Sequence, residues 1–293
     1  MAIETMTAAL VAWLAYCAGY CVRYFGVAGA LTWLLHGPLR ARLLRFRIQR
    51  EFPSRRSTNG EILWSISNAA CTGIVATLSL GAVQGGYTRM YFDVSDHGIA
   101  YAALSALVVV LGYDTWFYWQ HRLLHTRWMF ERVHAVHHRS TNPTPLATFA
   151  HHPVETLLGN AYFVLVLLAL PMHPLSLAAA GGAIWAIGLV AHLGYELYPR
   201  GFVRHPLLGW FNTATHHNLH HTEIGCDYGM WLNCWDRWMG TNHPAYAAVF
   251  EAATQRRPEV GRIDLSVAGA EARSASGVGQ AAAASAPATA AGA

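Results

Sequence analysis

The sequence contains no lysine and few charged residues of any kind. Charged residues make up only 12% of its 293 residues, whereas hydrophobic residues make up 54%. A typical soluble domain carries about 25% charged residues. This scarcity argues against a soluble protein and favours one embedded in a lipid bilayer. The formal net charge of +4 rests on arginine alone, and no nucleic-acid partner is expected.

Sequence signatures of several redox cofactors are also missing. The five cysteines form no C-x-x-C pair, which argues against an iron–sulfur cluster and a zinc ribbon. We interpret them as small buried hydrophobic side chains. The chain also has no H-P-G-G haem-binding segment and no G-x-G-x-x-G dinucleotide fingerprint. It therefore carries no recognisable electron source of its own.

Long apolar runs are the main feature of secondary structure. About 20 helical residues cross a bilayer core about 30 Å thick, which predicts an all-α integral membrane bundle of about four to five spans. The runs cover residues 6–35, 61–83, 98–120, 154–170 and 174–197. Arg23 interrupts the first run, which is either one tilted span or a shorter span followed by an interfacial piece. The fourth run is short for a span.

These runs divide the chain into three parts. Residues 1–97 form an N-terminal membrane region that includes an arginine-rich loop at residues 37–60. Residues 98–250 form a catalytic region that contains most histidines. Residues 251–293 are rich in Ala, Gly and Ser and are expected to be mostly disordered. Arginine-rich loops favour the cytoplasmic side. Counting spans from that loop places every histidine cluster on the cytoplasmic face of a multi-pass protein.

The most unusual feature is the number and spacing of the histidines. Of 17 histidines, 14 lie between His121 and His221. Residues three or four positions apart share a face of a helix, so each cluster is expected to point its rings one way. Three such clusters occur: His121 and His125; His134, His137 and His138; His217, His220 and His221.

Eight imidazoles are enough for two metal ions. A closed zinc site needs only four ligands, and nitrogen ligands alone suit zinc, copper, nickel or iron. His192 lies near the end of the last span and could complete the site. Asp114 lies within a span, where an acidic residue is a functional candidate; we interpret it as an acceptor that orients a ligand imidazole. The other candidates for supporting roles are Tyr118, His152, Glu155, Glu196, Asp227 and Tyr228.

These motifs resemble the fatty acid hydroxylase and sterol desaturase superfamily. The order H-x-x-x-H, H-x-x-H-H, H-x-x-H-H behind membrane spans is similar to its histidine boxes. The resemblance extends to His152-Pro-Val-Glu155, to Asp227-Tyr-Gly and to Trp235-Asp-Arg, and covers residues 98–245. Asp227 stands where that superfamily usually has Asn. His151 and His216 are additional histidines, expected to be solvated or to support the ligands.

The resemblance implies a non-haem di-iron centre and O2 as co-substrate. The implied ligands are the eight box histidines, with His192 as a ninth. The implied reaction is hydroxylation of a lipid C–H bond, with desaturation by the same site as the alternative. A non-catalytic metal-binding or metal-transport membrane protein is the alternative of another class. Substrates such as sterols or fatty acyl chains, and the oligomeric state, stay open. A separate electron donor is expected, such as a ferredoxin or a cytochrome b5-like protein with its reductase.

Overall fold

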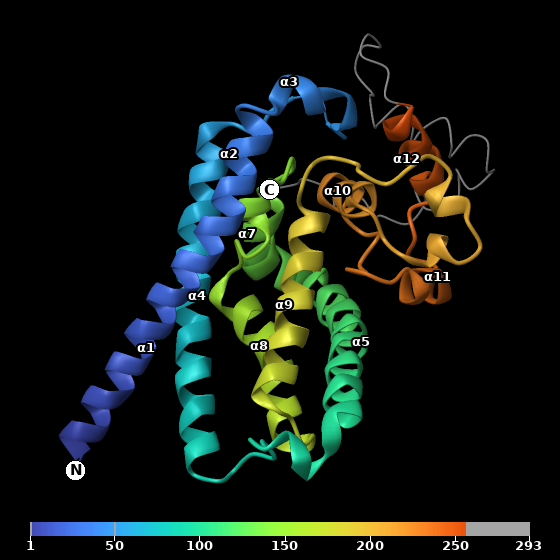
Figure 1. Ribbon diagram of the computed structural model, residues 1–293. Helices are drawn as coiled ribbons and strands as arrows, with labels where there is room; N and C mark the ends of the chain where they lie inside the picture. The colour runs from blue at the N-terminus through green and yellow to red at the C-terminus, as the bar shows by residue number, and fades with distance from the viewer. Residues whose placement is uncertain (1, 50, 256–293) are drawn as a thin grey trace, which may run out of the picture.

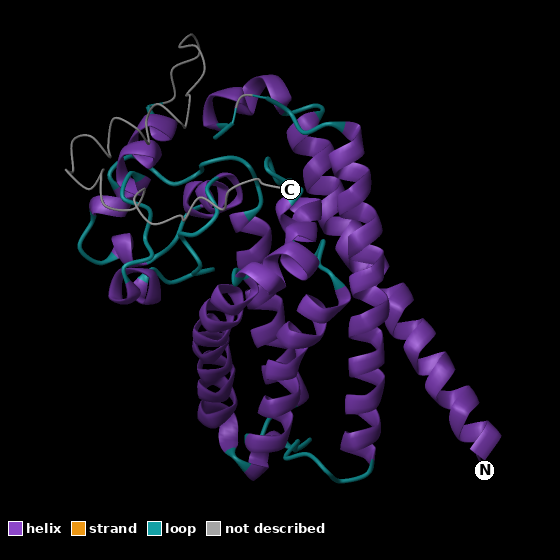
Figure 2. Ribbon diagram, turned by 180° about the vertical axis from the view of Figure 1, so that it is seen from behind, coloured by secondary structure: helices purple, strands orange, loops and turns teal. Residues whose placement is uncertain are grey.

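The computed structural model describes residues 2–49 and 51–255, and their regular structure is helical throughout. Figures 1 and 2 show a bundle of long helices with a group of short helices and loops at one end. The prediction of an all-α bundle is confirmed. The Ala-, Gly- and Ser-rich tail predicted to be disordered falls on residues outside those described, apart from the end of α12 (Tyr246–Thr254).

Four helical segments are long and apolar enough to cross a membrane. They are Thr5–His36, Arg55–Gln84 (α4), Gly98–Leu124 (α5) and Pro174–Ala191 (α9). A shorter apolar helix, α8 (Pro153–Ala169), precedes α9. At 1.5 Å per residue, α8 is about 25 Å long, below the thickness of a bilayer core. The predicted number of four to five spans agrees with this set.

The first segment is continuous and contains a wide turn. Helix α1 (Ala2–Tyr24) passes through a π-helical turn, η1 (Phe25–Gly29), into α2 (Ala30–His36). Arg23 therefore does not end the helix, and the tilted single segment is the alternative that the structure supports. Single π turns in α-helices occur frequently at functional sites.

Helix α9 ends earlier than its apolar run predicts. The run extends to residue 197, but the helix ends at Ala191 with His192 as its C-cap. Beyond it, Gly194 adopts a φ of +70°, and Tyr195 pairs with Arg47 in an isolated antiparallel bridge. The segment after His192 therefore turns to pair with the arginine-rich loop instead of continuing the helix.

The long helices pack through mixed apolar and polar contacts. Helix α1 packs on α4, α4 on α8, and α5 on both α8 and α9. Asn68 of α4 links three helices, since its Oδ1 accepts from the Tyr20 hydroxyl at 2.9 Å and its Nδ2 donates to Thr156 Oγ1 at 2.9 Å. Hydrogen bonds between helices of this kind stabilise packing where the surroundings are apolar.

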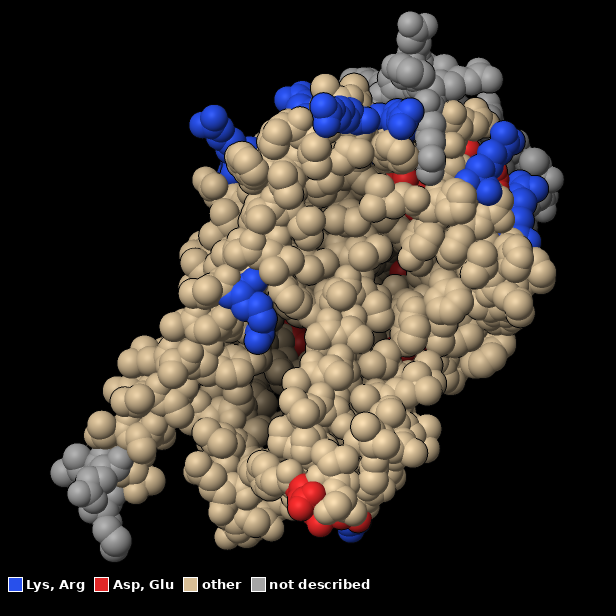
Figure 3. Space-filling view, in the orientation of Figure 1, with Lys and Arg blue, Asp and Glu red and all other residues tan. Residues whose placement is uncertain are grey.

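The short elements gather at one end of the bundle (Figure 1). They include α3 (Arg40–Leu43), α7 (Ala135–His138), α10 (Ala214–Thr222), α11 (Cys234–Met239) and α12. Basic side chains collect over α3 at this end, whereas the flank of the bundle in Figure 3 is nearly free of charge. Helices α5 and α9 both terminate here, so the predicted gathering of the histidine clusters at one end of the spans is observed.

Candidate metal centre

Nine buried or half-buried imidazoles meet where α5, α7, α9 and α10 come together. The last turn of α5 carries His121, and His125 is its C-cap. A second π turn, η4 (Phe130–His134), ends at His134 and leads into α7. The remaining rings come from α10 and from His192 at the end of α9. These residues form two groups that could each hold a metal ion.

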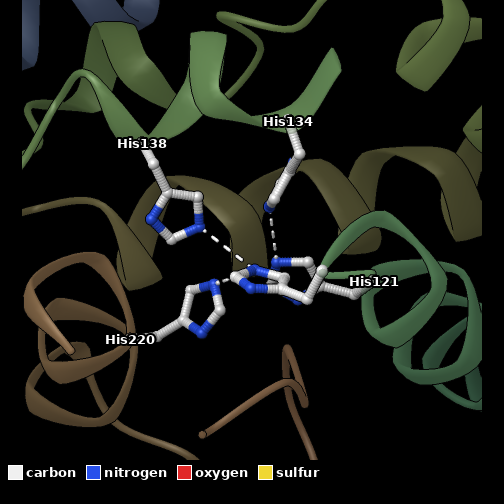
Figure 4. A group of neighbouring side chains, drawn as sticks. His121, His134, His138 and His220 are labelled. Carbon is white, nitrogen blue, oxygen red and sulfur yellow. Dashed lines mark hydrogen bonds between the residues drawn. The ribbon is translucent and has the colours of Figure 1, made fainter. Parts of the chain in front are cut away.

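The first group contains five histidines whose ligand atoms lie within 4.8 Å of one another: His121, His125, His134, His138 and His220. Their Nε2 atoms face a common centre. His121 Nε2 lies 3.0 Å from His134 Nε2, and His125 Nε2 lies 3.2 Å from the Nε2 atoms of both His138 and His220. Figure 4 shows these rings converging from different segments of the chain.

The second group contains four histidines: His137, His192, His217 and His221. His217 Nε2 is 2.9 Å from His192 Nε2 and 3.1 Å from His221 Nε2, and His192 Nε2 is 3.4 Å from His137 Nε2. The two groups are neighbours, since the ring centroids of His138 and His221 are 5.0 Å apart.

Each H-x-x-H-H box supplies both groups, which differs from the expectation that a box points its rings one way. Residues i and i+4 are about 40° apart around a helix, whereas i+3 lies about 60° to the other side. His134 and His138 therefore stay together while His137 turns to the second group. In the third box, His217 and His221 stay together and His220 turns to the first group.

The nitrogen spacing fits metal coordination. Two imidazole nitrogens that bind one ion at about 2.0–2.1 Å, with an angle of about 90–110° between the bonds, lie about 2.8–3.4 Å apart. The contacts of 2.9–3.4 Å within the groups fall in this range. Several Nδ1 atoms, including that of His217, are buried without a hydrogen-bond partner in the described chain. The donor set thus fits two ions held almost entirely by nitrogen.

Hydrogen bonds at Nδ1 fix the orientation of several rings. The Nδ1–H groups of His121, His192 and His220 donate to the carbonyls of Tyr228 (2.8 Å), Gly188 (2.7 Å) and Cys226 (2.7 Å), respectively. These bonds require the proton on Nδ1 and leave the Nε2 lone pair free for a metal.

A carboxylate supports a fourth ring. His134 Nδ1 lies 3.0 Å from Glu155 Oε2, and His151 Nε2 lies 3.6 Å from Glu155 Oε1. Glu155 therefore lies beside one ring of the five-histidine group. His151 is mostly buried, with 19% of its side chain exposed.

Burial keeps these imidazoles neutral. It lowers the pKa of His125 to about 2 and the pKa values of His192 and His220 to about 4, in each case as the largest cause. A charged imidazolium loses hydration when buried, so the neutral base is favoured. Neutral imidazole is the form that binds metal, so the site is ready to do so at physiological pH.

Asp227 holds the loop that supplies two of the carbonyls. It lies between Cys226 and Tyr228 and is the only non-glycine residue with positive φ, at +57°, in the described chain. Its Oδ1 accepts from the His243 backbone N–H at 2.6 Å, and His216 Nε2 lies 3.3 Å from the same oxygen. His216 is fully buried, so of the two expectations for this ring the solvated one is wrong.

Asp236 anchors the next residues of this loop. Its carboxylate accepts from the backbone N–H groups of Tyr228 at 2.9 Å and Gly229 at 2.7 Å. The Tyr228 carbonyl, which accepts the hydrogen bond from His121 Nδ1, is thereby held from both sides, by Asp227 and Asp236.

Other predicted residues brace the surroundings instead of touching the rings. Asp114 Oδ1 accepts from the backbone N–H groups of Trp231 and Leu232, both at 3.1 Å. Its predicted bond to a ligand imidazole is therefore not observed, because the acidic group is used to hold the C-terminal loop against α5. Tyr118 shares a hydrogen bond of 2.9 Å with Thr241 Oγ1.

Two further candidates act at helix N-termini. Glu196 Oε2 accepts from the backbone N–H and hydroxyl of Thr215 at 3.0 and 2.7 Å, which fixes the start of α10. His152 is the N-cap of α8, and its Nδ1 accepts from the Val154 N–H at 3.2 Å. It belongs to neither histidine group, and its role beside the ligands is not observed.

A cavity of about 1110 Å³ reaches the histidines from inside the bundle. Its lining includes His121, His134, His137, His192 and His217 at one end. At the other end lie residues far from the rings, including Phe92 and Pro174. Between these ends it is lined mainly by apolar side chains of α4, α8 and α9. The cavity therefore brings an apolar compartment to the metal groups.

Sequence reasoning missed the backbone carbonyls that orient the rings. The carbonyls of Gly188, Cys226 and Tyr228 carry no side-chain signature, so only a loop conformation reveals them. The sequence does mark Asp236, since this acidic residue lies between Trp235 and Trp238, shortly after the third box.

Comparisons with known proteins agree with this geometry. The family model for fatty acid hydroxylase matches residues 106–241. A Delta(7)-sterol 5(6)-desaturase of Schizosaccharomyces pombe is 26% identical over 205 residues, which covers 70% of this chain and 66% of that protein. Lathosterol oxidase of Mus musculus is 28% identical over 65% of this chain and 63% of its own length. Cholesterol 25-hydroxylase of Rattus norvegicus is 32% identical over 46% of this chain and 45% of its own length.

These alignments leave a third or more of each relative unmatched, and no solved structure matches the chain. The family match nevertheless contains all three boxes, from His121 to His221, together with Asp227 and Asp236. Together with His192, the rings of those boxes form the two groups that could each hold a metal ion, and the two acidic residues hold the loop behind them. Over residues 106–241, and in the boxes and acidic residues within that segment, this chain is similar to the fatty acid hydroxylase family.

Proposed function

We propose that this protein is an O2-dependent oxidoreductase that hydroxylates a C–H bond of a membrane lipid with a pair of iron ions. The observation that best supports this proposal is the convergence of nine imidazoles in two adjacent groups at the end of an apolar cavity. Each group would hold one ion. At about 1110 Å³, the cavity is slightly larger than the range of about 300–1,000 Å³ that is typical of pockets for small ligands.

Iron is proposed because of the chemistry that the site would need. Side-chain acid–base groups do not break an alkyl C–H bond, so a bound metal pair would supply activation of O2. The chain contributes neutral nitrogen ligands, Nδ1 partners that fix ring orientation, and a pocket whose wall is mostly apolar. Nitrogen ligands alone also accept zinc or copper, so elemental analysis belongs in the test.

The cavity supports a lipid as the substrate. Its lining from α4 and α8 includes apolar side chains such as Val75, Leu80 and Val164, interspersed with uncharged polar ones such as Thr72 and Ser79. Burying hydrocarbon against such side chains is favourable by about 25 cal/mol per Å². A lipid that enters from the bilayer would place a C–H bond against His121, His134, His137, His192 and His217, the histidines that line the pocket.

Electrons would come from a separate protein. The resemblance predicts a ferredoxin or a cytochrome b5-like donor with its reductase, and the arginines near α3 offer a basic surface at the histidine end (Figure 3). The same arginines favour the cytoplasmic side for that end, which is our proposed orientation. The positive-inside rule alone is the simpler explanation of why this loop is rich in arginine.

Desaturation is the second candidate. It is favoured by the relatives named as a sterol desaturase and as lathosterol oxidase. Hydroxylation and desaturation both begin with hydrogen abstraction and differ in the fate of the substrate radical, which the ligand set does not determine. A metal transporter is disfavoured because ionisable groups would then be expected along a path through the membrane, whereas the compartment next to the rings is apolar.

The test combines product analysis with one histidine variant from each group. Lipids from cells with and without the gene, grown under labelled O2, would gain one labelled oxygen atom in hydroxylation or lose two hydrogen atoms in desaturation. We expect His137→Ala and His220→Ala to insert into the membrane but to lose metal and product. His205→Ala is the matched control, since His205 is exposed and outside both groups.

Three outcomes would contradict the proposal. Normal turnover in His137→Ala or His220→Ala would remove that residue from the ligands. Purified protein that holds zinc and no iron, and that regains no activity with iron, would argue against oxygen chemistry. Metal flux in liposomes without consumption of O2 would favour transport.

A further inference from the structure

Arg23 is a basic residue within a membrane-spanning segment that has no acidic partner. It lies in Thr5–His36, next to the π turn of residues 25–29. Its guanidinium carbon stands 5.9 Å from the ring centroids of both Tyr20 and Trp185. Within residues 2–49 and 51–255, the structure gives it no hydrogen bond or ion pair with a carboxylate. Its side chain is exposed on the flank of the bundle, so its guanidinium is open to an acidic ligand from outside the described chain.

A second unpaired donor lies beside it. The indole Nε1–H of Trp185, on α9, is buried and has no acceptor in the described chain. A buried donor without a partner is uncommon and costs about 1–3 kcal/mol. Arg23 and Trp185 both line the 1110 Å³ cavity, so two N–H donors from different helices face the same space without an oxygen to receive them.

The length of its helix allows Arg23 to lie at the depth of a lipid head group. The segment Thr5–His36 has 32 residues and is therefore about 48 Å long, against about 30 Å for a bilayer core. Arg23 lies about 27 Å from Thr5 and about 20 Å from His36, so it reaches the boundary of the hydrocarbon region when the excess length of the segment extends beyond the bilayer on the His36 side. Figure 3 shows a hollow on this flank with a basic side chain at its edge.

From these observations we propose that Arg23 and Trp185 form a binding site for the carboxylate of a single-chain acidic lipid whose hydrocarbon occupies the cavity. Guanidinium and indole N–H groups together offer donors to both carboxylate oxygens, and such charge-assisted bonds are the strong ones. The acid that lines the cavity within the described chain, Glu155, lies against His134 and His151 and is already in contact with basic groups.

The site is connected to the metal groups along one face of α9. Trp185, Gly188 and His192 are spaced i, i+3 and i+7, and all three line the cavity. Seven residues correspond to about 10 Å. A carboxylate at Trp185 would therefore leave the oxidised carbon several methylene groups away. The carboxylate site specifies the class of substrate for the proposed function, and it rests on that proposal for the reaction itself. It also departs from the sterols named for the relatives, because a sterol carries a neutral hydroxyl.

Binding of lipid probes tests the site without any turnover. The purified protein with its resident metal, in neutral detergent, is titrated calorimetrically with hexadecanoate, its methyl ester and hexadecyl phosphate. We expect hexadecanoate to bind about 10–100-fold more tightly than the ester, the range that a hydrogen-bonded charge contributes. Arg23→Gln should reduce this ratio to within about twofold, and Trp185→Phe, which keeps a ring but removes the N–H, should reduce it in part.

Matched variants make the result specific. Arg127→Gln removes an exposed arginine outside the cavity and should leave the ratio unchanged. His217→Ala should lose metal and product but keep the ratio, so the acid site and the proposed reaction fail separately. Equal binding of acid and ester by the wild type, or an unchanged ratio in Arg23→Gln, would overturn the site. Tenfold tighter binding of hexadecyl phosphate than of hexadecanoate would overturn the assignment to a carboxylate and favour a phospholipid head group.

Discussion

Replacement of Asp227 is expected to weaken the five-histidine group although Asp227 contacts none of its rings. Its backbone has a φ of +57°, a region that Asp and Asn tolerate and that costs other residues about 1–2 kcal/mol. Its Oδ1 also accepts the buried His243 N–H, and an unpaired buried donor costs about 1–3 kcal/mol. Asp227→Ala should therefore destabilise the folded loop by about 2–5 kcal/mol in total.

The loss would reach the metal group through the two neighbouring carbonyls. Those of Cys226 and Tyr228 receive the Nδ1–H groups of His220 and His121. Both rings belong to the five-histidine group, whereas the four-histidine group uses neither carbonyl. Loss of such a supporting contact usually lowers metal affinity or activity about 10–100-fold. We expect Asp227→Ala to lose about one metal ion of a pair under mild chelation before it loses the other.

Two companion variants separate the backbone from the side chain. Asp227→Asn keeps the tolerance of positive φ and an oxygen that accepts from His243, so it should retain nearly all metal. Asp227→Gly relieves the backbone but lacks the acceptor, so it should lie between the two. Metal content by elemental analysis and the thermal midpoint in detergent are the measurements. Full metal retention in Asp227→Ala, or equal losses in the Asn and Ala variants, would refute this account.

Three further predictions follow from the contacts around the site. Glu155→Gln replaces the carboxyl group beside His134 with an amide and should lower metal affinity about 10–100-fold, measured by competition with a chelator; unchanged competition would contradict a supporting role. Asp114→Ala leaves the Trp231 and Leu232 amides unpaired and should lower the thermal midpoint and reduce activity without changing metal content; metal loss at full stability would show a contact with the ligands instead. Removal of metal should lower the thermal midpoint, since a ligand at 1,000 times its Kd stabilises by about 4 kcal/mol, and an identical midpoint with and without metal would argue that the groups bind no ion.

Much of the site could be predicted because its signals are local. The spacing of His134, His137 and His138 follows from helix geometry, and apolar runs of about 20 residues mark spans by length alone. His192 was identified by its place at the end of an apolar run. The split of each box between two groups was not anticipated. It depends on which side of α7 and α10 faces each centre, and this is set by packing against distant segments.

Other contacts could not be predicted from local sequence either, because they also depend on how distant segments pack together. Asp114 was expected to orient an imidazole, but it binds the backbone at Trp231, more than a hundred residues away. The orienting groups are largely carbonyls, whose positions depend on the conformation of the 226–229 loop and of the end of α9. Arg23 appeared as an interruption of an apolar run, and its relation to Trp185 required both helices to be placed.

The division of the boxes has a consequence for how the centre forms. Helix α7 gives His138 to one group and His137 to the other, and α10 gives His220 to one and His221 to the other. Neither group is complete until both short helices dock against the ends of α5 and α9. The buried Asp236 and Glu196, which fix the 226–229 loop and the start of α10, therefore act on both groups at once. Two ions bound by groups built from shared helices would be held at a separation fixed by the fold, which is the arrangement that joint action of two ions on one substrate atom requires.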